Sequence, residues 1–156
     1  MTTQNLRLTA GSVFSSGTGE FEQRDLLVAA GLISEASAEA DWEELDCRGL
    51  LVVPGLIDLH VHVYHHATVL GVEPDLCCLQ RGVTTVVDGG SAGAMTFPGL
   101  ERFVIKQSQT RVLAWLHLAC HGLAGAACSG EEWGPGGEVD SLNVLKVTSA
   151  RVLSDQ

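Results

Sequence analysis

The sequence predicts an α/β protein in which a segment of short strands precedes a run of alternating strands and helices. Residues 1–50 contain short apolar stretches separated by turn-forming residues. From residue 51 the pattern changes to strand, helix, strand, helix, strand, and Val83–Val87 is a β-branched run typical of a buried parallel strand. With 156 residues, 46% of them hydrophobic and 18% charged, the chain has the composition of a globular protein with its own core.

The first 50 residues are predicted to form short strands joined by turns. Strands are expected at Leu6–Leu8 and Asp25–Ala29, with the Gly- and Ser-rich stretch Gly11–Gly19 as a connection. Two more short strands are expected at Leu32–Ile33 and Leu45–Cys47.

Residues 51–156 are predicted to form three strand–helix units. Strands are expected at Leu50–Val63, Val83–Val87 and Arg111–Leu118, helices at Glu73–Arg81, Phe97–Gln107 and Ser141–Leu153, and a Gly- and Ala-rich loop at Gly122–Gly137. Pro74 and Pro98 stand near the starts of the first two helices, where proline is favourable. This alternation predicts parallel strands joined by right-handed crossovers.

Two histidines, His60 and His62, alternate with aliphatic residues at the end of the first of these strands. Side chains at i and i+2 of a strand point to one face, so two imidazoles can lean onto one metal ion with Zn–N bonds of about 2.0–2.1 Å. Two alternating histidines also occur for packing alone. Asp58 shares their face, where it could orient a ligand or a metal-bound water, or could simply cap the strand end.

The run Pro54–His62, which reads Pro-Gly-Leu-Ile-Asp-Leu-His-Val-His, resembles the first-strand signature of the amidohydrolase superfamily of metal-dependent hydrolases. Gly82–Gly93 is similar to the second strand of the branch that contains deacetylase-like and dihydroorotase-like members. Phe97–Leu100 and Thr110–Leu116 look like the deacetylase-like members in particular. The resemblance covers about residues 5 to 145 and corresponds to the N-terminal portion of a family member.

The resemblance implies a partial (β/α)8, TIM-like barrel. About three βα units would lie in residues 51–156, preceded in residues 1–50 by the N-terminal part of a small β-sandwich. It also implies that His60 and His62 are metal ligands, usually for zinc. Family members complete the site with a lysine or glutamate of the fourth strand, histidines of the fifth and sixth, and a catalytic aspartate of the eighth. A complete barrel takes about 250 residues.

Four further residues are expected at the same rim as possible contacts to a substrate. They are Asp88, Ser91, Gly93 and His121. Ser91 and Gly93 could contact a carboxylate or carbonyl, or could belong to a plain Gly-rich turn, and His121 departs from the family pattern. His65 and His66 could bind metal or stand in solvent. Lys106 and Lys146 are not placed as a bridging lysine.

The resemblance implies metal-assisted hydrolysis of a small amide or ester, namely a non-peptide C–N bond or an ester bond cleaved in the manner of a deacetylase. A dihydroorotase-like cyclic amidase and a non-catalytic remnant or binding module are the alternatives. No catalytic residue is identified, because the later strands are missing. We therefore expect a truncated chain that is weakly active or inactive, so that its status as an enzyme stays open.

Composition excludes several other classes. The net charge of −10 argues against nucleic-acid partners and anionic membranes, which recruit basic patches. No signal peptide and no run of 18 apolar residues is seen, so a soluble, cytoplasmic protein is expected. The five cysteines show no disulfide or zinc-knuckle spacing and are expected as buried free thiols. An incomplete sheet edge could promote self-association.

Overall fold

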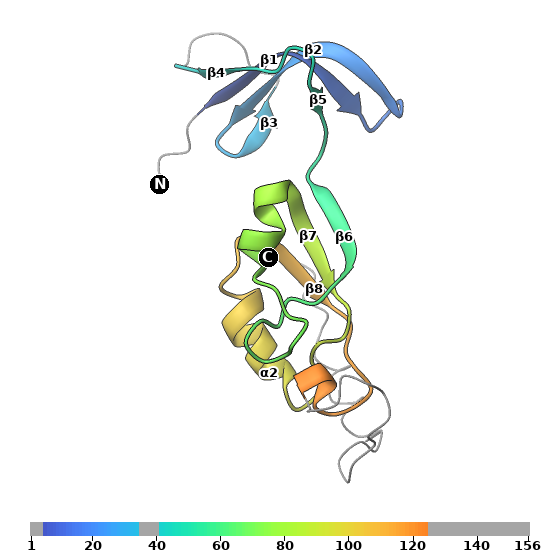
Figure 1. Ribbon diagram of the computed structural model, residues 1–156. Coiled ribbons are helices and arrows are strands. Elements are labelled where there is room, and N and C mark those ends of the chain that lie inside the picture. Colours follow the sequence, from blue (N-terminus) through green and yellow to red (C-terminus); the bar gives the residue numbers. More distant parts are fainter. Residues whose placement is uncertain (1–4, 35–40, 125–156) are drawn as a thin grey trace. The chain divides into compact units, whose positions relative to one another are not determined.

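The computed structural model describes residues 5–34 and 41–124 (Figure 1). The chain divides into two compact units, Met1–Pro54 and Gly55–Gln156, and each is described by itself. In the described residues, no helix is long and apolar enough to cross a membrane.

The first unit carries a five-stranded sheet (Figure 1). Its strands are β1 (Leu6–Ser15), β2 (Glu20–Ala29), β3 (Leu32–Ser34), β4 (Glu43–Asp46) and β5 (Leu51–Val52). The order is β3-β2-β1-β4, with β5 also paired to β1; β4 and β5 run parallel to β1, and the other pairs are antiparallel. Ala30 and Gly31, with φ of 52° and 79°, form the two-residue turn between β2 and β3, whose left-handed backbone suits the twist of a hairpin.

The expected connection at Gly11–Gly19 is wrong over most of its length, because β1 continues to Ser15. The strand passes this point through a bulge between Leu8 and Gly11. Ala10 adopts φ 55° there, and its N–H donates to Asp25 Oδ1 at 3.0 Å. A Cβ on Gly11 would lie 2.8 Å from Val52, so this glycine permits close packing against β5 instead of forming a turn.

The second unit contains three parallel strands in the order β6-β7-β8, which confirms the predicted alternation. The strands are β6 (Leu56–Val61), β7 (Val83–Asp88) and β8 (Arg111–Ala114). The crossovers contain α1 (Pro74–Cys77) with the 3-10 helix η1 (Leu79–Arg81), and α2 (Phe97–Leu100) with the π-helix η2 (Glu101–Ile105); a further 3-10 turn, η3 (Gly122–Ala124), follows β8. Glu73 caps α1 by accepting the backbone N–H of Leu76 at 2.6 Å.

The single strand expected at Leu50–Val63 is wrong, because the structure has two strands in different sheets. Pro54 cannot donate to a ladder, and a Cβ on Gly55 would lie 2.8 Å from Thr84 Cβ. The regular ladder of β8 ends at Ala114 and not at Leu118. Beyond it the chain bonds to the loop after β7 through His117 N–H and Ala92 O, at 2.9 Å. The helix expected at Ser141–Leu153 and the loop beyond residue 124 lie outside the described residues.

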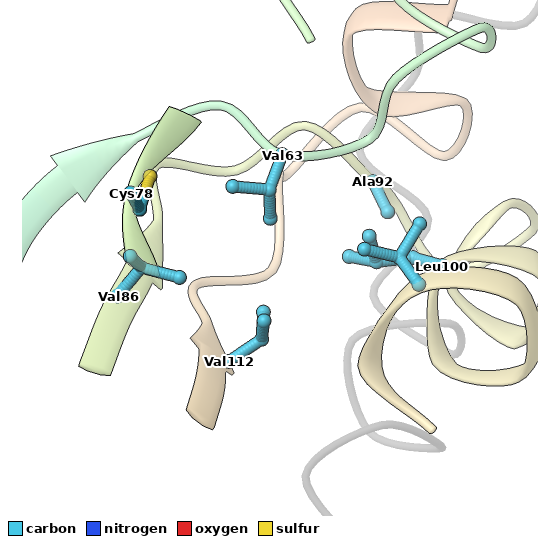
Figure 2. Close-up of a cluster of buried hydrophobic side chains, with 7 residues drawn as sticks. Val63, Cys78, Val86, Ala92, Leu100 and Val112 are labelled. Atoms are coloured by element: carbon cyan, nitrogen blue, oxygen red, sulfur yellow. The ribbon is translucent and has the colours of Figure 1, made fainter. Parts of the chain in front are cut away.

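The core of the second unit lies between its strands and the second crossover. Figure 2 shows Val86 of β7 and Val112 of β8 together with Val63 and with Leu100 of α2. Leu100, Val63 and Val86 are fully buried. Among the described residues, Cys47, Cys77 and Cys78 are free thiols.

Asp75 in α1 ties the first crossover to the start of β8. Its carboxylate accepts Thr110 Oγ1 at 2.7 Å, Thr110 N–H at 2.8 Å and Gln109 N–H at 2.9 Å. Burial opposes ionisation of this group, but the three hydrogen bonds outweigh that effect and lower the pKa of Asp75. The carboxylate therefore joins segments about 35 residues apart in the chain.

Candidate metal centre

His60 and His62 lie at the carboxyl end of β6, and the structure brings their rings together. The ring centroids are 5.5 Å apart with an interplanar angle of 76°, an edge-to-face contact. His60 is exposed and His62 is half-buried. The alternation of a strand thus places both imidazoles on one face, while their role as metal ligands stays a prediction.

Gly89, the residue after β7, lies directly against the rings of His60 and His62. A Cβ at this position would lie 2.6 Å from His60 Nε2 and 3.2 Å from His62 Cε1. Its N–H donates to Val61 O at 2.8 Å, which fixes this glycine beside the end of β6. The two imidazoles therefore lie side by side over a residue that has no side chain. A side chain at position 89 would occupy the space in which the two rings lie.

Ser91 contacts the same pair from the loop after β7. Its Oγ lies 2.9 Å from His62 Nδ1, and the residue is fully buried. In the structure the Ser91 hydroxyl is therefore paired with His62, and the predicted substrate contact of Ser91 stays a prediction.

Asp88 is also fully buried, and its carboxylate is occupied by the chain itself. Oδ2 accepts Val63 N–H at 2.8 Å, and Oδ1 accepts Gly90 N–H at 3.1 Å and Ser91 N–H at 2.6 Å. Gly93 is likewise buried, and a Cβ there would overlap the backbone at Ala119. Asp88 and Gly93 thus hold the loop together, while their predicted contact with a substrate stays a prediction.

Asp58 forms a local contact. Its Oδ1 accepts the backbone N–H of His60 at 3.0 Å, two residues along the chain. Burial raises the pKa of the Cys78 thiol, and the negative charge of Asp58 raises it further. Asp58 lies within β6, and both predicted roles of its carboxylate stay predictions.

His121 pairs with its neighbour instead of the histidine pair. Its Nδ1 lies 3.1 Å from Cys120 Sγ, and its backbone carbonyl accepts Thr96 Oγ1 at 3.0 Å. Sequence reasoning missed His117, whose ring packs beside Gly90 and whose Nδ1 accepts Ala119 N–H at 2.9 Å. Its position shortly after β8 was the only available signal.

His65 and His66 form a second ring pair in the loop after β6. Their centroids are 4.9 Å apart at 69°, and His65 Nδ1 lies 3.2 Å from Val63 O. His66 is exposed and has φ 63°.

The described residues supply fewer ligands than a catalytic zinc ion needs. Catalytic zinc takes three protein ligands and a water. Within residues 5–34 and 41–124, no three His, Cys, Asp or Glu side chains are grouped to hold a metal ion. The imidazoles of His60 and His62 fit two of the positions, and the described residues offer no third.

Comparison with known proteins finds relatives of this chain among deacetylases. A deacetylase from Agrobacterium fabrum is 41% identical over 100 residues, covering 64% of this chain and 24% of that protein. A deacetylase from Brucella anthropi is 43% identical over 93 residues, covering 60% and 23%. The crystal structure of a dihydroorotase matches with a TM-score of 0.80 and 27% identity, covering 96% of this chain and 40% of that one.

Other relatives are named adenine deaminase and dihydroorotase. No family model matches the chain. The chain combines parallel βαβ units with a His-x-His pair at the end of the first strand, and its sequence is similar to that of the two deacetylases. The chain is related to the N-terminal portion of amidohydrolase superfamily proteins, which confirms the resemblance seen in the sequence. The matched stretch spans about a quarter of the length of the two deacetylases.

Proposed function

We propose that this chain carries the first two ligands of the zinc site of a deacetylase-type amidohydrolase, a hydrolase of a non-peptide amide or ester bond. The observation that carries the proposal is the convergence of His60 and His62 above Gly89. The names of the two deacetylase relatives support the reaction class.

Zinc bound at this point would activate a water for hydrolysis and polarise the scissile carbonyl. His60 and His62 would hold the ion, and the missing side chain of Gly89 leaves room for their two rings. Two imidazoles leave a catalytic zinc one protein ligand short. We therefore expect this polypeptide by itself to bind zinc weakly and to turn over little or no substrate.

A cyclic amide is the second candidate substrate. The similarity of this chain to the crystal structure of a dihydroorotase, over 96% of its length, supports it. Both candidates share the same histidine pair and the same chemistry at the carbonyl, so a substrate panel separates them. The panel contains N-acetyl amino acids and dihydroorotate.

The test compares zinc content in three forms of the full chain, measured by mass spectrometry after dialysis against zinc. They are the wild type, His60→Ala/His62→Ala, and the control His65→Ala/His66→Ala, which removes the other edge-to-face pair. We expect zinc in the wild type and the control, and loss in the first variant. Equal zinc in all three would refute the site.

The same samples test the expected self-association. In β6, an edge strand of its sheet, Ile57 and Leu59 are 63% and 72% exposed. Such an edge can pair with another chain. We expect a size-exclusion mass above that of a monomer, and a strictly monomeric chain would exclude self-association through this edge.

A further inference from the structure

The loop after β7 contacts the candidate metal centre through residues that sequence reasoning assigned to the substrate. Ser91 and Asp88 are each fully buried, and each bonds to residues of the chain. Their contacts converge on His62 and its immediate neighbour Val63, which makes them part of the support of the histidine pair.

Asp88 fixes two segments at once. One carboxylate oxygen accepts the N–H of Val63, directly after His62, and the other accepts the N–H of Gly90 and of Ser91. Three backbone N–H groups from two segments thus end on one buried carboxylate. The end of β6 and the turn that carries Ser91 are thereby held in one arrangement.

Ser91 Oγ lies 2.9 Å from His62 Nδ1. A hydroxyl can donate or accept, and a neutral imidazole carries its proton on one nitrogen only. If Ser91 accepts from Nδ1–H, the lone pair is on Nε2 and is free for a cation. Histidine ligands usually donate their other N–H to a fixed acceptor, which sets both tautomer and ring orientation.

We propose that Asp88 and Ser91 are positioning residues: Asp88 fixes the turn that places Ser91 Oγ, and Ser91 accepts the Nδ1–H of His62 so that Nε2 faces the metal position. The part of this proposal that concerns a metal rests on the proposed function. The ring orientation and the tautomer of His62 are independent of it, because they are properties of the metal-free chain.

The tautomer is measured directly by long-range proton–nitrogen NMR of histidine rings in the metal-free, 15N-labelled full chain at a pH above 7.5. The His62 signals are identified by their disappearance in His62→Ala. We expect the wild type to carry the proton on Nδ1, and Ser91→Ala to shift population towards the Nε2–H form. The control Ser108→Ala removes a hydroxyl that bonds only to Val104 O at 2.8 Å, and it should leave His62 unchanged.

Asp88→Asn places an N–H₂ group among backbone donors and should move the His62 tautomer in the same direction as Ser91→Ala. Because this variant also disturbs the three backbone hydrogen bonds of Asp88, Ser91→Ala is the deciding substitution. Wild-type His62 protonated on Nε2, or a tautomer indifferent to Ser91→Ala, would overturn the proposal.

Zinc affinity provides the second readout. Ser91→Ala should weaken zinc binding by about 10–100-fold, as loss of such an outer contact does, while Ser108→Ala leaves it unchanged. A chain that shows the Nδ1–H tautomer but binds no zinc would refute the proposed function and support the positioning of His62. A chain that binds zinc equally with Ser91→Ala would refute the positioning role.

Discussion

Two histidine pairs stand within seven residues of each other, and their settings differ. The rings of His60 and His62 and those of His65 and His66 both meet edge to face. The first pair rests on Gly89 and on Ser91, which is 29 residues from His62 in the chain. For the second pair, the polar contact is local, from His65 to the carbonyl of Val63 two residues away.

We propose that two neighbouring imidazoles form a metal site only where other elements fix their rings, and that for His60 and His62 these elements come from the end of β7. The following predictions test the surroundings of these rings, in decreasing order of expected effect.

Gly89→Ala should have the largest effect on metal binding. The added Cβ would lie 2.6 Å from His60 Nε2 and would displace that ring from its partner. Loss of a residue that only orients a ligand usually lowers metal affinity by about 10–100-fold. Because Gly89→Ala displaces a ligand ring itself, we expect the zinc affinity to fall by about 100-fold or more, measured by isothermal titration calorimetry. The matched control is Gly17→Ala, since nothing lies within 4 Å of a Cβ there; equal zinc affinity in both variants would contradict the role of Gly89.

Asp88→Ala should have the largest effect on stability. It leaves the buried N–H groups of Val63, Gly90 and Ser91 without their acceptor. We expect the free energy of unfolding to fall by about 3 kcal/mol or more, measured by urea denaturation. A change below about 0.5 kcal/mol would show that the turn does not depend on this carboxylate.

Asp75→Asn should have an intermediate effect, and one that depends on pH. The pKa of Asp75 is lowered in the folded chain, so its stabilisation is present above the unfolded pKa of about 3.9 and is lost as pH falls through the folded pKa. We expect a loss of about 1–3 kcal/mol at pH 7 that shrinks in acid. Denaturation curves of both forms at pH 7 and at pH 3 measure it, and a pH-independent difference would contradict the assignment.

His66→Gly should have the smallest effect. His66 adopts φ 63°, a conformation that costs a non-glycine residue roughly 1 kcal/mol. We expect glycine to leave stability unchanged within about 0.5 kcal/mol or to raise it slightly, because relief of strain is offset by greater freedom of the unfolded chain. Zinc binding should not change. Loss of zinc in this variant would place the metal at the second pair.

Local pattern predicted most of the second unit. The β-branched run of β7 and the prolines of α1 and α2 predicted parallel strands joined by helical crossovers, which the structure has in the order β6-β7-β8. Alternation along β6 predicted that His60 and His62 share one face. Such signals depend on near neighbours in the chain, and a single sequence contains them.

Contacts between distant segments were not predictable in the same way. The bulge at Ala10 depends on Asp25 in the adjacent strand, and the break between β5 and β6 depends on which sheet each strand joins. The contact of Ser91 with His62 depends on the register of β6 against β7, which shifts between Asp58 and Val61. The sequence contains these residues, but the residues that they contact depend on how distant segments of the chain pack together.

The most direct test of the account adds zinc to the 15N-labelled full chain and follows the ring nitrogens of its six histidines. We predict that the Nε2 signals of His60 and His62 shift on binding while those of His65 and His66 stay in place. Shifts at His65 and His66, with His60 and His62 unaffected, would contradict the proposed metal centre.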